Sequence, residues 1–288
     1  MELLTIACNL CGSKEYKQLT RCRIEDIDSA VNIDDLSIVQ CGNCGLVYVN
    51  PQPSYSRQEL KGLYSEEYFK APYMQFYSND SGTQSNESFK SRLAWIGRYT
   101  NPGKLLDIGC AGGGFLKAAK EQGWEAVGVE VSESASKQAR DRGFEVITGQ
   151  LKDAGFKDSS FDLVSAGDIF EHICDPKSFL EEINRILKKG GLLYLAVPDF
   201  DGLYYRLALI VSKLNKKNYF VLPQHLYFFT KKTLEKYFLK TDFKILDRRS
   251  SQSTIIDKGL KAFALRVLFF LAVLAGKRDR ILLLAEKR

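Results

Sequence analysis

Two groups of residues in this chain of 288 residues have the types and the spacing that chemistry requires. The first group is Cys8, Cys11, Cys41 and Cys44, which form two C-x2-C pairs, each followed directly by a glycine. Two residues between ligands allow a tight turn to present both thiolates to one tetrahedral ion, and glycine relieves backbone strain where the turn leaves the metal. Four unligated thiols, or disulfides, are the alternative. The pairs predict a Zn2+ site in a small N-terminal ribbon.

The second group is the stretch LLDIGCAGGGFL, Leu105 to Leu116, in which Asp107 precedes a glycine-rich turn. Interpreted as G-x-G-x-x-G, the turn suits a dinucleotide, with Glu130 about 20 residues further on to bind a ribose. A pyrophosphate would, however, lie against the carboxylate of Asp107. S-adenosylmethionine carries an ammonium, a sulfonium and no phosphate, so a carboxylate favours its positive end. The turn therefore predicts a cationic cofactor.

The elements that position these residues follow from the hydrophobic pattern. Between Thr100 and Pro198, short β-rich apolar runs alternate with amphipathic helical windows. This rhythm predicts an α/β fold with a doubly wound, mainly parallel sheet. Strands are predicted at 104–109, 125–131, 144–149, 161–168, 192–198, 243–249 and 280–287. Helices are predicted at 114–123, 132–143, 175–191, 202–217, 230–241 and 260–276.

Turn-rich stretches at Asn50–Ser54 and Thr100–Lys104 divide the chain into three regions. Residues 1–54 form the zinc ribbon, which the metal stabilises and which we expect to unfold separately. Residues 55–100 form an aromatic-rich helical connector, whose tyrosines either close over the site as a lid or serve packing. Residues 101–288 form the cofactor-binding domain, with helical insertions toward its C-terminus.

Together these features resemble the class I S-adenosylmethionine-dependent methyltransferases, whose first strand ends in D-x-G-x-G-x-G; here the pattern is Asp107, Gly109, Ala111 and Gly113. The whole chain resembles the bacterial small-molecule members that carry an N-terminal zinc ribbon, a tyrosine-rich connector and the motif HLYFFT, at 225–230. The resemblance implies a seven-stranded Rossmann-like methyltransferase sheet, with the C-terminal helical insertions on the side of the methyl acceptor.

The resemblance also implies which residues contact S-adenosylmethionine. Glu130 would hold both ribose hydroxyls, and Gln150 stands at the adenine edge, where an acid is more usual. Asp168 and its neighbours would lie beside the methionine end. The implied set is Asp107, Gly109, Cys110, Ala111, Gly113, Glu130, Val131, Gln150, Leu151, Asp168, Ile169 and Phe170. Ala111 places a methyl group where the family has glycine.

Methyl transfer to a hydroxyl requires a base near the acceptor, and the chain has only two histidines. His225 lies among aromatic residues beyond the central strands, and His172 follows the fourth predicted strand. Both are candidate catalytic bases; the alternative for each is a histidine that holds backbone groups in a turn. The predicted function is S-adenosylmethionine-dependent methylation of a small molecule, at a hydroxyl oxygen of a sugar, phenol or lipid-linked acceptor.

Two other functions stay open. An RNA methyltransferase would bind its substrate through the ribbon, but residues 1–54 carry four Lys and Arg against seven Asp and Glu, which disfavours nucleic acid as a partner. The stretch GDIF, 167–170, also differs from the Asp/Asn-Pro-Pro-aromatic turn of enzymes that methylate bases. A non-catalytic adaptor would rest on the departures at Ala111 and Gln150.

The last part of the chain is strongly basic. Residues 201–288 carry 19 Lys and Arg against seven Asp and Glu, a balance of +12. Apolar helices with basic ends there fit either a peripheral contact with an anionic membrane or a buried helix pair or homodimer interface. The uncharged run from Val267 to Gly276 is too short to span a bilayer. Because no secretory signal is recognisable, we expect a cytoplasmic protein, at the inner membrane surface if the membrane contact forms.

Overall fold

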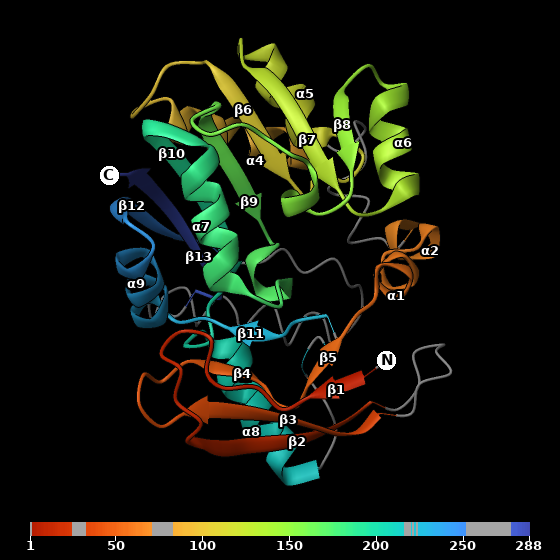
Figure 1. Ribbon diagram of the computed structural model, residues 1–288, viewed down its shortest axis with the longest axis vertical. Coiled ribbons are helices and arrows are strands. Elements are labelled where there is room, and N and C mark those ends of the chain that lie inside the picture. Colours follow the sequence, from red (N-terminus) through yellow and green to blue (C-terminus); the bar gives the residue numbers. More distant parts are fainter. Residues whose placement is uncertain are drawn as a thin grey trace.

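The computed structural model describes residues 2–24, 33–70, 83–215, 220, 222, 224–251 and 278–288. A seven-stranded sheet with helices on both faces forms one end of the molecule, and a four-stranded antiparallel sheet forms the other end (Figure 1). Strand β11 lies between the two, beside the smaller sheet to which it belongs.

The large sheet has the strand order β12-β13-β10-β9-β6-β7-β8. Its strands are β6 (Lys104–Ile108), β7 (Glu125–Glu130), β8 (Glu145–Thr148), β9 (Phe161–Gly167), β10 (Leu187–Pro198), β12 (Phe243–Ser251) and β13 (Arg280–Lys287). Strands β6 to β10 pair in parallel, whereas β13 runs antiparallel to β10 and β12. The strand order reverses between β6 and β9, and sheets of this type bind ligands at the carboxyl ends of the strands there. The predicted fold class is confirmed.

Both faces of the large sheet are buried, because alternate residues of each strand point to opposite sides. In β10, Leu193 and Leu195 belong to one core cluster, whereas Tyr194 and Ala196 belong to the other. The first face is covered by α7 (Pro176–Ile186) and α9 (Lys231–Lys240). The second face is covered by α4 (Thr83–Ile96), α5 (Gly114–Glu121) and α6 (Glu133–Asp141). Thr230 caps α9 through its side chain, which accepts a hydrogen bond from the Thr233 N–H.

One predicted helix is shorter than expected. The helical pattern at 175–191 predicts a helix up to a glycine pair, but α7 ends at Ile186 and the chain continues as β10. Leu187 pairs with Phe161 of β9, and the register then shifts before Leu192. Pairing with β9 has therefore outweighed the local helical preference of this segment.

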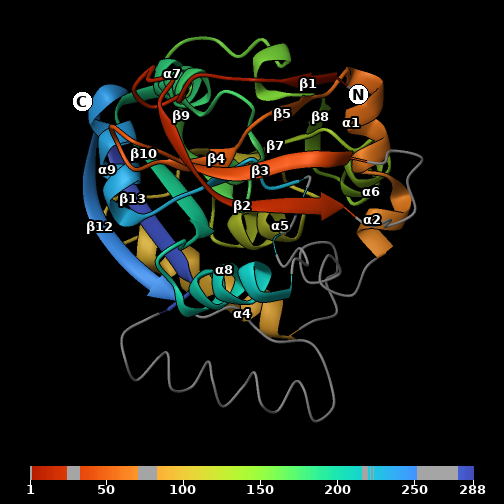
Figure 2. The same cartoon turned by 90° about the horizontal axis from the view of Figure 1, so that it is seen from below.

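The smaller sheet joins segments that are far apart in the sequence. It contains β2 (Tyr16–Ile24), β3 (Ile33–Cys41), β4 (Val47–Val49) and β11 (Tyr227–Phe228), in the order β11-β4-β3-β2. A separate pair is formed by β1 (Glu2–Leu4) and β5 (Gln52–Ser54). Helix α8 (Leu203–Asn215) covers one face of the smaller sheet, and Figure 2 shows β2, β3 and α8 on the side away from the large sheet. Two short helices, α1 (Arg57–Leu63) and α2 (Glu66–Lys70), come after β5 in the chain.

The described residues of the ribbon share their core with the rest of the chain. Leu46 and Tyr48 belong to the same core cluster as Val164 of β9 and Leu195 of β10. On the other face, Val47 packs with residues of α8. This shared packing argues against separate unfolding of the ribbon, which stays a question for measurement. The domain boundaries at residues 54 and 100 stay predictions, although α4, which precedes residue 100, packs on the large sheet.

Some predicted features lie outside the described residues. These are the helix at 260–276, the basic residues Lys216, Lys217 and Lys277, and the part of the connector at 71–82. Within the described part of the chain, every helix is too short or too polar to cross a bilayer.

The shared core generates a prediction about unfolding. Leu46 is fully buried, so Leu46→Ala is expected to lower the free energy of unfolding by about 2–5 kcal/mol and the melting temperature by roughly 5–15 °C. The chain's only two tryptophans, Trp95 and Trp124, lie in the core on the far face of the large sheet. If the core is shared, the melting temperature measured by tryptophan fluorescence should fall by the full amount. A tryptophan transition that matches the wild type would contradict the shared core, and Leu239→Ala, at a position 67% exposed, is the control.

Candidate functional site

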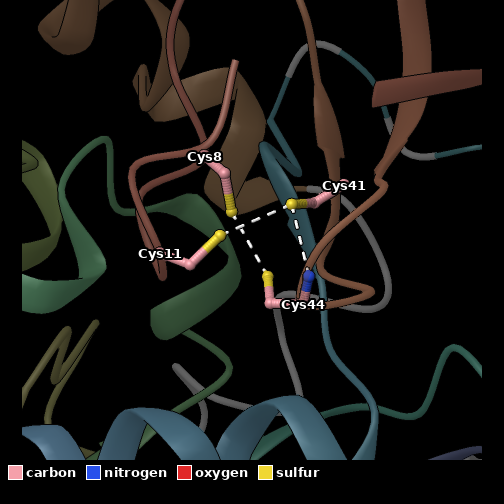
Figure 3. A group of neighbouring side chains, drawn as sticks. All are labelled: Cys8, Cys11, Cys41 and Cys44. Carbon is pink, nitrogen blue, oxygen red and sulfur yellow. Dashed lines mark hydrogen bonds between the residues drawn. The ribbon is translucent and has the colours of Figure 1, made fainter. Parts of the chain in front are cut away.

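The four cysteines of the paired motifs converge on one point (Figure 3). Their sulfur atoms lie within 4.8 Å of one another, with Cys8 and Cys44 3.4 Å apart and Cys11 and Cys41 3.5 Å apart. Zn–S bonds of about 2.3 Å in a tetrahedron place sulfur atoms about 3.8 Å apart. The group therefore fits a zinc ion with little adjustment.

The backbone of each C-x2-C turn supports this arrangement. Gly12 and Gly45 have φ angles of +76° and +81°, and their N–H groups donate to the carbonyls of Cys8 and Cys41 at 2.7 and 3.1 Å. Burial raises the pKa of the Cys41 thiol, but backbone hydrogen bonds, led by that of Cys44, outweigh it and lower the pKa from 9.0 to about 7. The thiolate is the form that binds metal, so these N–H groups favour ligation by Cys41, whereas burial raises the pKa of the Cys8 and Cys44 thiols.

The glycine-rich turn leads from β6 into α5 at the carboxyl edge of the large sheet. Gly109 and Gly113 have φ angles of +72° and +86°. The φ angle of Gly109 favours glycine, and a Cβ atom there would in addition lie 2.2 Å from Cδ1 of Ile169, whose side chain would have to move. Ala111 also has a positive φ, +46°, which costs a residue with a Cβ about 1–2 kcal/mol. Its N–H donates to Oε2 of Glu130 at 3.0 Å, which helps to hold this conformation.

Two buried carboxyl groups lie beside the turn. Asp107 is the next-to-last residue of β6, and Glu130 is the last residue of β7. The second oxygen of Glu130 accepts the Ser132 N–H at 2.9 Å. Burial raises the pKa of Asp107 from 3.8 to about 7, although the positive charge of Arg92 opposes the rise. Burial also raises the pKa of Glu130. An anionic pyrophosphate would add to this unfavourable charge, whereas an ammonium and a ribose diol would satisfy it, so the dinucleotide interpretation is disfavoured.

The other predicted cofactor residues lie on loops at the same edge, and Phe170 is the one whose side chain lies elsewhere. Cys110 and Leu151 are buried, and Val131 and Gln150 are half-buried. Asp168, after β9, forms an ion pair with Arg280, and the neighbouring Ile169 covers Gly109. Phe170 is fully buried and stacks on Phe229, with ring centroids 4.6 Å apart. Its side chain therefore belongs to the core beneath the edge.

The two histidines lie together, although 52 residues separate the loops that hold them. Their ring centroids are 4.7 Å apart and their planes meet at 85°. His172 ends the short helix η2 (Phe170–His172), and its Nδ1 lies 3.0 Å from the carbonyl of Gln224. Since a carbonyl only accepts, Nδ1 carries the proton and Nε2 keeps its lone pair. Nδ1 of His225 lies 3.3 Å from the Tyr205 hydroxyl.

Burial controls the charge of this pair. It lowers the pKa of His172 from 6.5 to about 4, and it lowers the pKa of His225 well below 6.5, with a further contribution from the neighbouring His172. Both imidazoles are therefore neutral at pH 7, and a neutral imidazole can accept a proton.

The sequence analysis missed two residues around the histidine pair, Glu171 and Tyr205, and it included Tyr64 only as one of the connector tyrosines. Ligand-type atoms of Glu171, His172 and His225 lie within 4.8 Å of one another, and Oε2 of Glu171 is buried with no hydrogen-bond partner in the described part of the chain. Burial raises the pKa of Glu171 well above 4.5. Tyr205 contacts His225, and the half-buried Tyr64 has its ring 6.4 Å from that of His172. The adjacent acid and histidine in FEHICDP were the available signal for Glu171.

Comparison with known families and curated proteins finds a methyltransferase domain in this chain. A family model described as "Methyltransferase domain" matches residues 84–248, more than half of the chain. A protein of Methanocaldococcus jannaschii without an assigned function is 32% identical over 114 residues, which cover 40% of this chain and 54% of that protein. A ubiquinone biosynthesis O-methyltransferase of Methylococcus capsulatus is 30% identical over 128 residues, 41% of this chain and 54% of that protein. The chain spans about half the length of these curated relatives.

Solved structures share the fold. A protein of Pyrococcus horikoshii OT3 superposes with a TM-score of 0.55 at 19% identity, over 78% of this chain and 100% of that one. A SAM-dependent methyltransferase from Archaeoglobus fulgidus superposes with a TM-score of 0.51 at 22% identity, over 75% of this chain and 100% of that one. At these identities the similarity establishes the architecture.

The cysteine geometry predicts one zinc ion per chain. Elemental analysis of protein purified without chelators should return one equivalent, because four sulfur atoms with this spacing form a closed tetrahedral site. Cys8→Ser should remove most of the zinc, whereas Cys174→Ser, at an exposed cysteine outside the group, should retain it. A wild-type value of zero or two equivalents would contradict the assignment.

Proposed function

Because this chain belongs to the methyltransferase-domain family, we propose that it is an S-adenosylmethionine-dependent enzyme that methylates a hydroxyl oxygen of a small molecule. The acceptor classes that we propose are sugars, phenols and lipid-linked compounds. The observation that carries this proposal is the position of the histidine pair, beside the edge of the sheet that holds the two buried acids. Tyr64 lies near both: burial raises the pKa of its hydroxyl, and the charges of Glu130 and Glu171 raise it further.

The residues of the glycine-rich turn fit the cofactor. When bound, S-adenosylmethionine supplies an electrophilic methyl group on a sulfonium. Glu130 offers carboxylate oxygens to the ribose hydroxyls while it keeps its hydrogen bonds to the backbone of the turn. Asp107 is buried near Arg92 and offers a countercharge to the ammonium. The glycines let the backbone approach the ligand closely.

The histidine pair supplies the base. His225 is the residue that we propose to accept the proton of the acceptor hydroxyl, and His172 supports it through the ring contact. In both rings Nδ1 already has a partner. The proposed role requires the His225 tautomer in which Nδ1–H donates to the Tyr205 hydroxyl and Nε2 keeps the lone pair that accepts the proton. The surrounding rings of Tyr205 and Phe228 exclude water from His225, which keeps the imidazole neutral, in the form that has a lone pair to accept a proton.

The comparisons support oxygen as the methylated atom, because the Methylococcus relative is named as an O-methyltransferase. For RNA as the substrate we find no favouring contact among the described residues. The ribbon uses its knuckles for contacts within the chain: Lys236 and Lys240 of α9 donate to the carbonyls of Cys44 and Leu10 at 3.0 and 2.9 Å. A non-catalytic adaptor does not account for the buried histidine pair.

The raised pKa of Asp107 generates a prediction about cofactor binding. Below pH 7 the free protein holds a proton on this carboxyl, and a bound ammonium favours its loss, so affinity should rise with pH as pH increases toward 7. Calorimetry with S-adenosylmethionine at pH 6.5, in two buffers of different ionisation enthalpy, should show release of most of one proton. Asp107→Asn should abolish the release and weaken binding by about 1–3 kcal/mol. Equal proton release by the variant would exclude Asp107 as the source.

Turnover tests the proposed reaction. Incubation with methyl-labelled S-adenosylmethionine and pools of phenols, sugars and lipid-linked hydroxyl compounds should yield a labelled ether. His225→Gln should lower kcat by about 10²–10⁴-fold, since it removes the base, and should leave the affinity for S-adenosylmethionine unchanged. The exposed-site variant Leu239→Ala is the control. Transfer to RNA alone, or a kcat unaffected by His225→Gln, would refute the proposal.

A further inference from the structure

The first cysteine knuckle contacts the segment that follows His172. Asn9, between Cys8 and Cys11, donates from Nδ2 to Oδ1 of Asp175 at 2.8 Å. Its Oδ1 accepts the Lys177 N–H at 3.1 Å. Asp175 is the N-cap of α7 and stands three residues after His172. The first knuckle therefore holds the start of α7, and with it the end of η2.

The second knuckle contacts the segment that follows His225. The turn from Cys41 to Cys44 closes the hairpin of β3 and β4, and the Cys41 N–H donates to the carbonyl of Leu46 at 2.9 Å. Tyr48 of β4 pairs with Tyr227 of β11, and their stacked rings are 6.3 Å apart. In addition, the Val49 N–H donates to the carbonyl of Leu226 at 2.9 Å. The second knuckle therefore holds β11, which begins two residues after His225.

The two segments meet at the histidine pair. The Leu226 N–H donates to the carbonyl of Glu171 at 2.8 Å, and the ring of His172 donates to the carbonyl of Gln224. Each histidine is thus connected to one knuckle, and a metal ion is the group that would join the two knuckles to each other.

We propose that the zinc centre is a clamp for the histidine pair: by joining the two knuckles, it fixes the position of His172 relative to His225. Asn9 and Tyr48 are the positioning residues that connect the knuckles to the two segments. This role rests on the proposed function, in which the pair holds and moves the acceptor proton. It also gives the metal a purpose in a ribbon that already supplies β2, β3 and β4 to the smaller sheet, since the ion would join two loops that are 30 residues apart in sequence at Cys11 and Cys41.

The test uses the full chain and the fact that it contains two histidines only. Protein labelled with carbon-13 at the histidine Cε1 position gives two ring signals, which report the pair directly. Asn9→Ala removes the link to α7, and Tyr48→Leu removes the ring that stacks on Tyr227 while it fills most of the volume.

Each variant has a matched control. Asn43→Ala changes the asparagine of the second knuckle, which is exposed. Tyr48→Phe keeps the ring and removes a hydroxyl that is buried with no hydrogen-bond partner among the residues described. Zinc content and the dissociation constant of S-adenosylmethionine are measured for every variant.

Asn9→Ala and Tyr48→Leu are expected to shift both histidine signals by more than a line width and to change the dissociation constant of S-adenosylmethionine by less than about twofold, since the cofactor edge is a separate set of contacts. Both controls are expected to match the wild type. Unchanged signals in Asn9→Ala and Tyr48→Leu would overturn the proposal, as would shifts of equal size in the controls. A parallel loss of cofactor affinity would also overturn it, because the effect would then be general unfolding. The methyl-transfer assay is independent of these signals, so the two proposals can fail separately.

Discussion

The hydrogen bond between the Leu226 N–H and the carbonyl of Glu171, 2.8 Å long, is the contact on which the position of the histidine pair depends. It joins the loop after β9 of the large sheet to the segment that continues into β11 of the smaller sheet. Neither loop is regular enough to hold its histidine alone, since η2 is a single turn and β11 has two residues. The pairing of β11 with β4 gives that segment a rigid support, and the ribbon supplies it.

The glycine-rich turn depends on a different interaction. The carboxyl group of Glu130 holds the backbone of the turn and also offers oxygens to a ligand. Glu130 accepts hydrogen bonds from the N–H groups of Ala111 and Ser132, so it shapes the turn before any ligand is present. The same oxygens suit ribose hydroxyls. This explains how alanine can replace glycine at position 111: the hydrogen bond offsets part of the cost of a positive φ angle.

Burial is the common cause of the electrostatics of both sides. It raises the pKa of Asp107, Glu130 and Glu171, and it lowers the pKa of both histidines. The edge of the sheet therefore tends toward neutral side chains at physiological pH. A cationic ligand restores the charge of an acid there, whereas the histidines stay in the form that accepts a proton. The buried acids, which suit positive charge, are thus separate from the histidines, which stay neutral.

The sequence by itself determined the features that depend on neighbours a few residues apart. Periods of two and of three to four residues located the central strands and helices, Thr230 marked the start of α9, and the two C-x2-C turns were identified by their glycines. The edge position of Asp107 and Glu130 was also predictable, because parallel strands end at one side of a sheet. Tertiary structure decided the rest. Leu187 joined β10 instead of α7 because Phe161 pairs with it, and β11 joined the ribbon through residues nearly 180 positions away in sequence. The partners of Glu171 and the histidines, and the direction of their pKa shifts, depend on which distant segments cover them, and no local pattern in the chain carries that information.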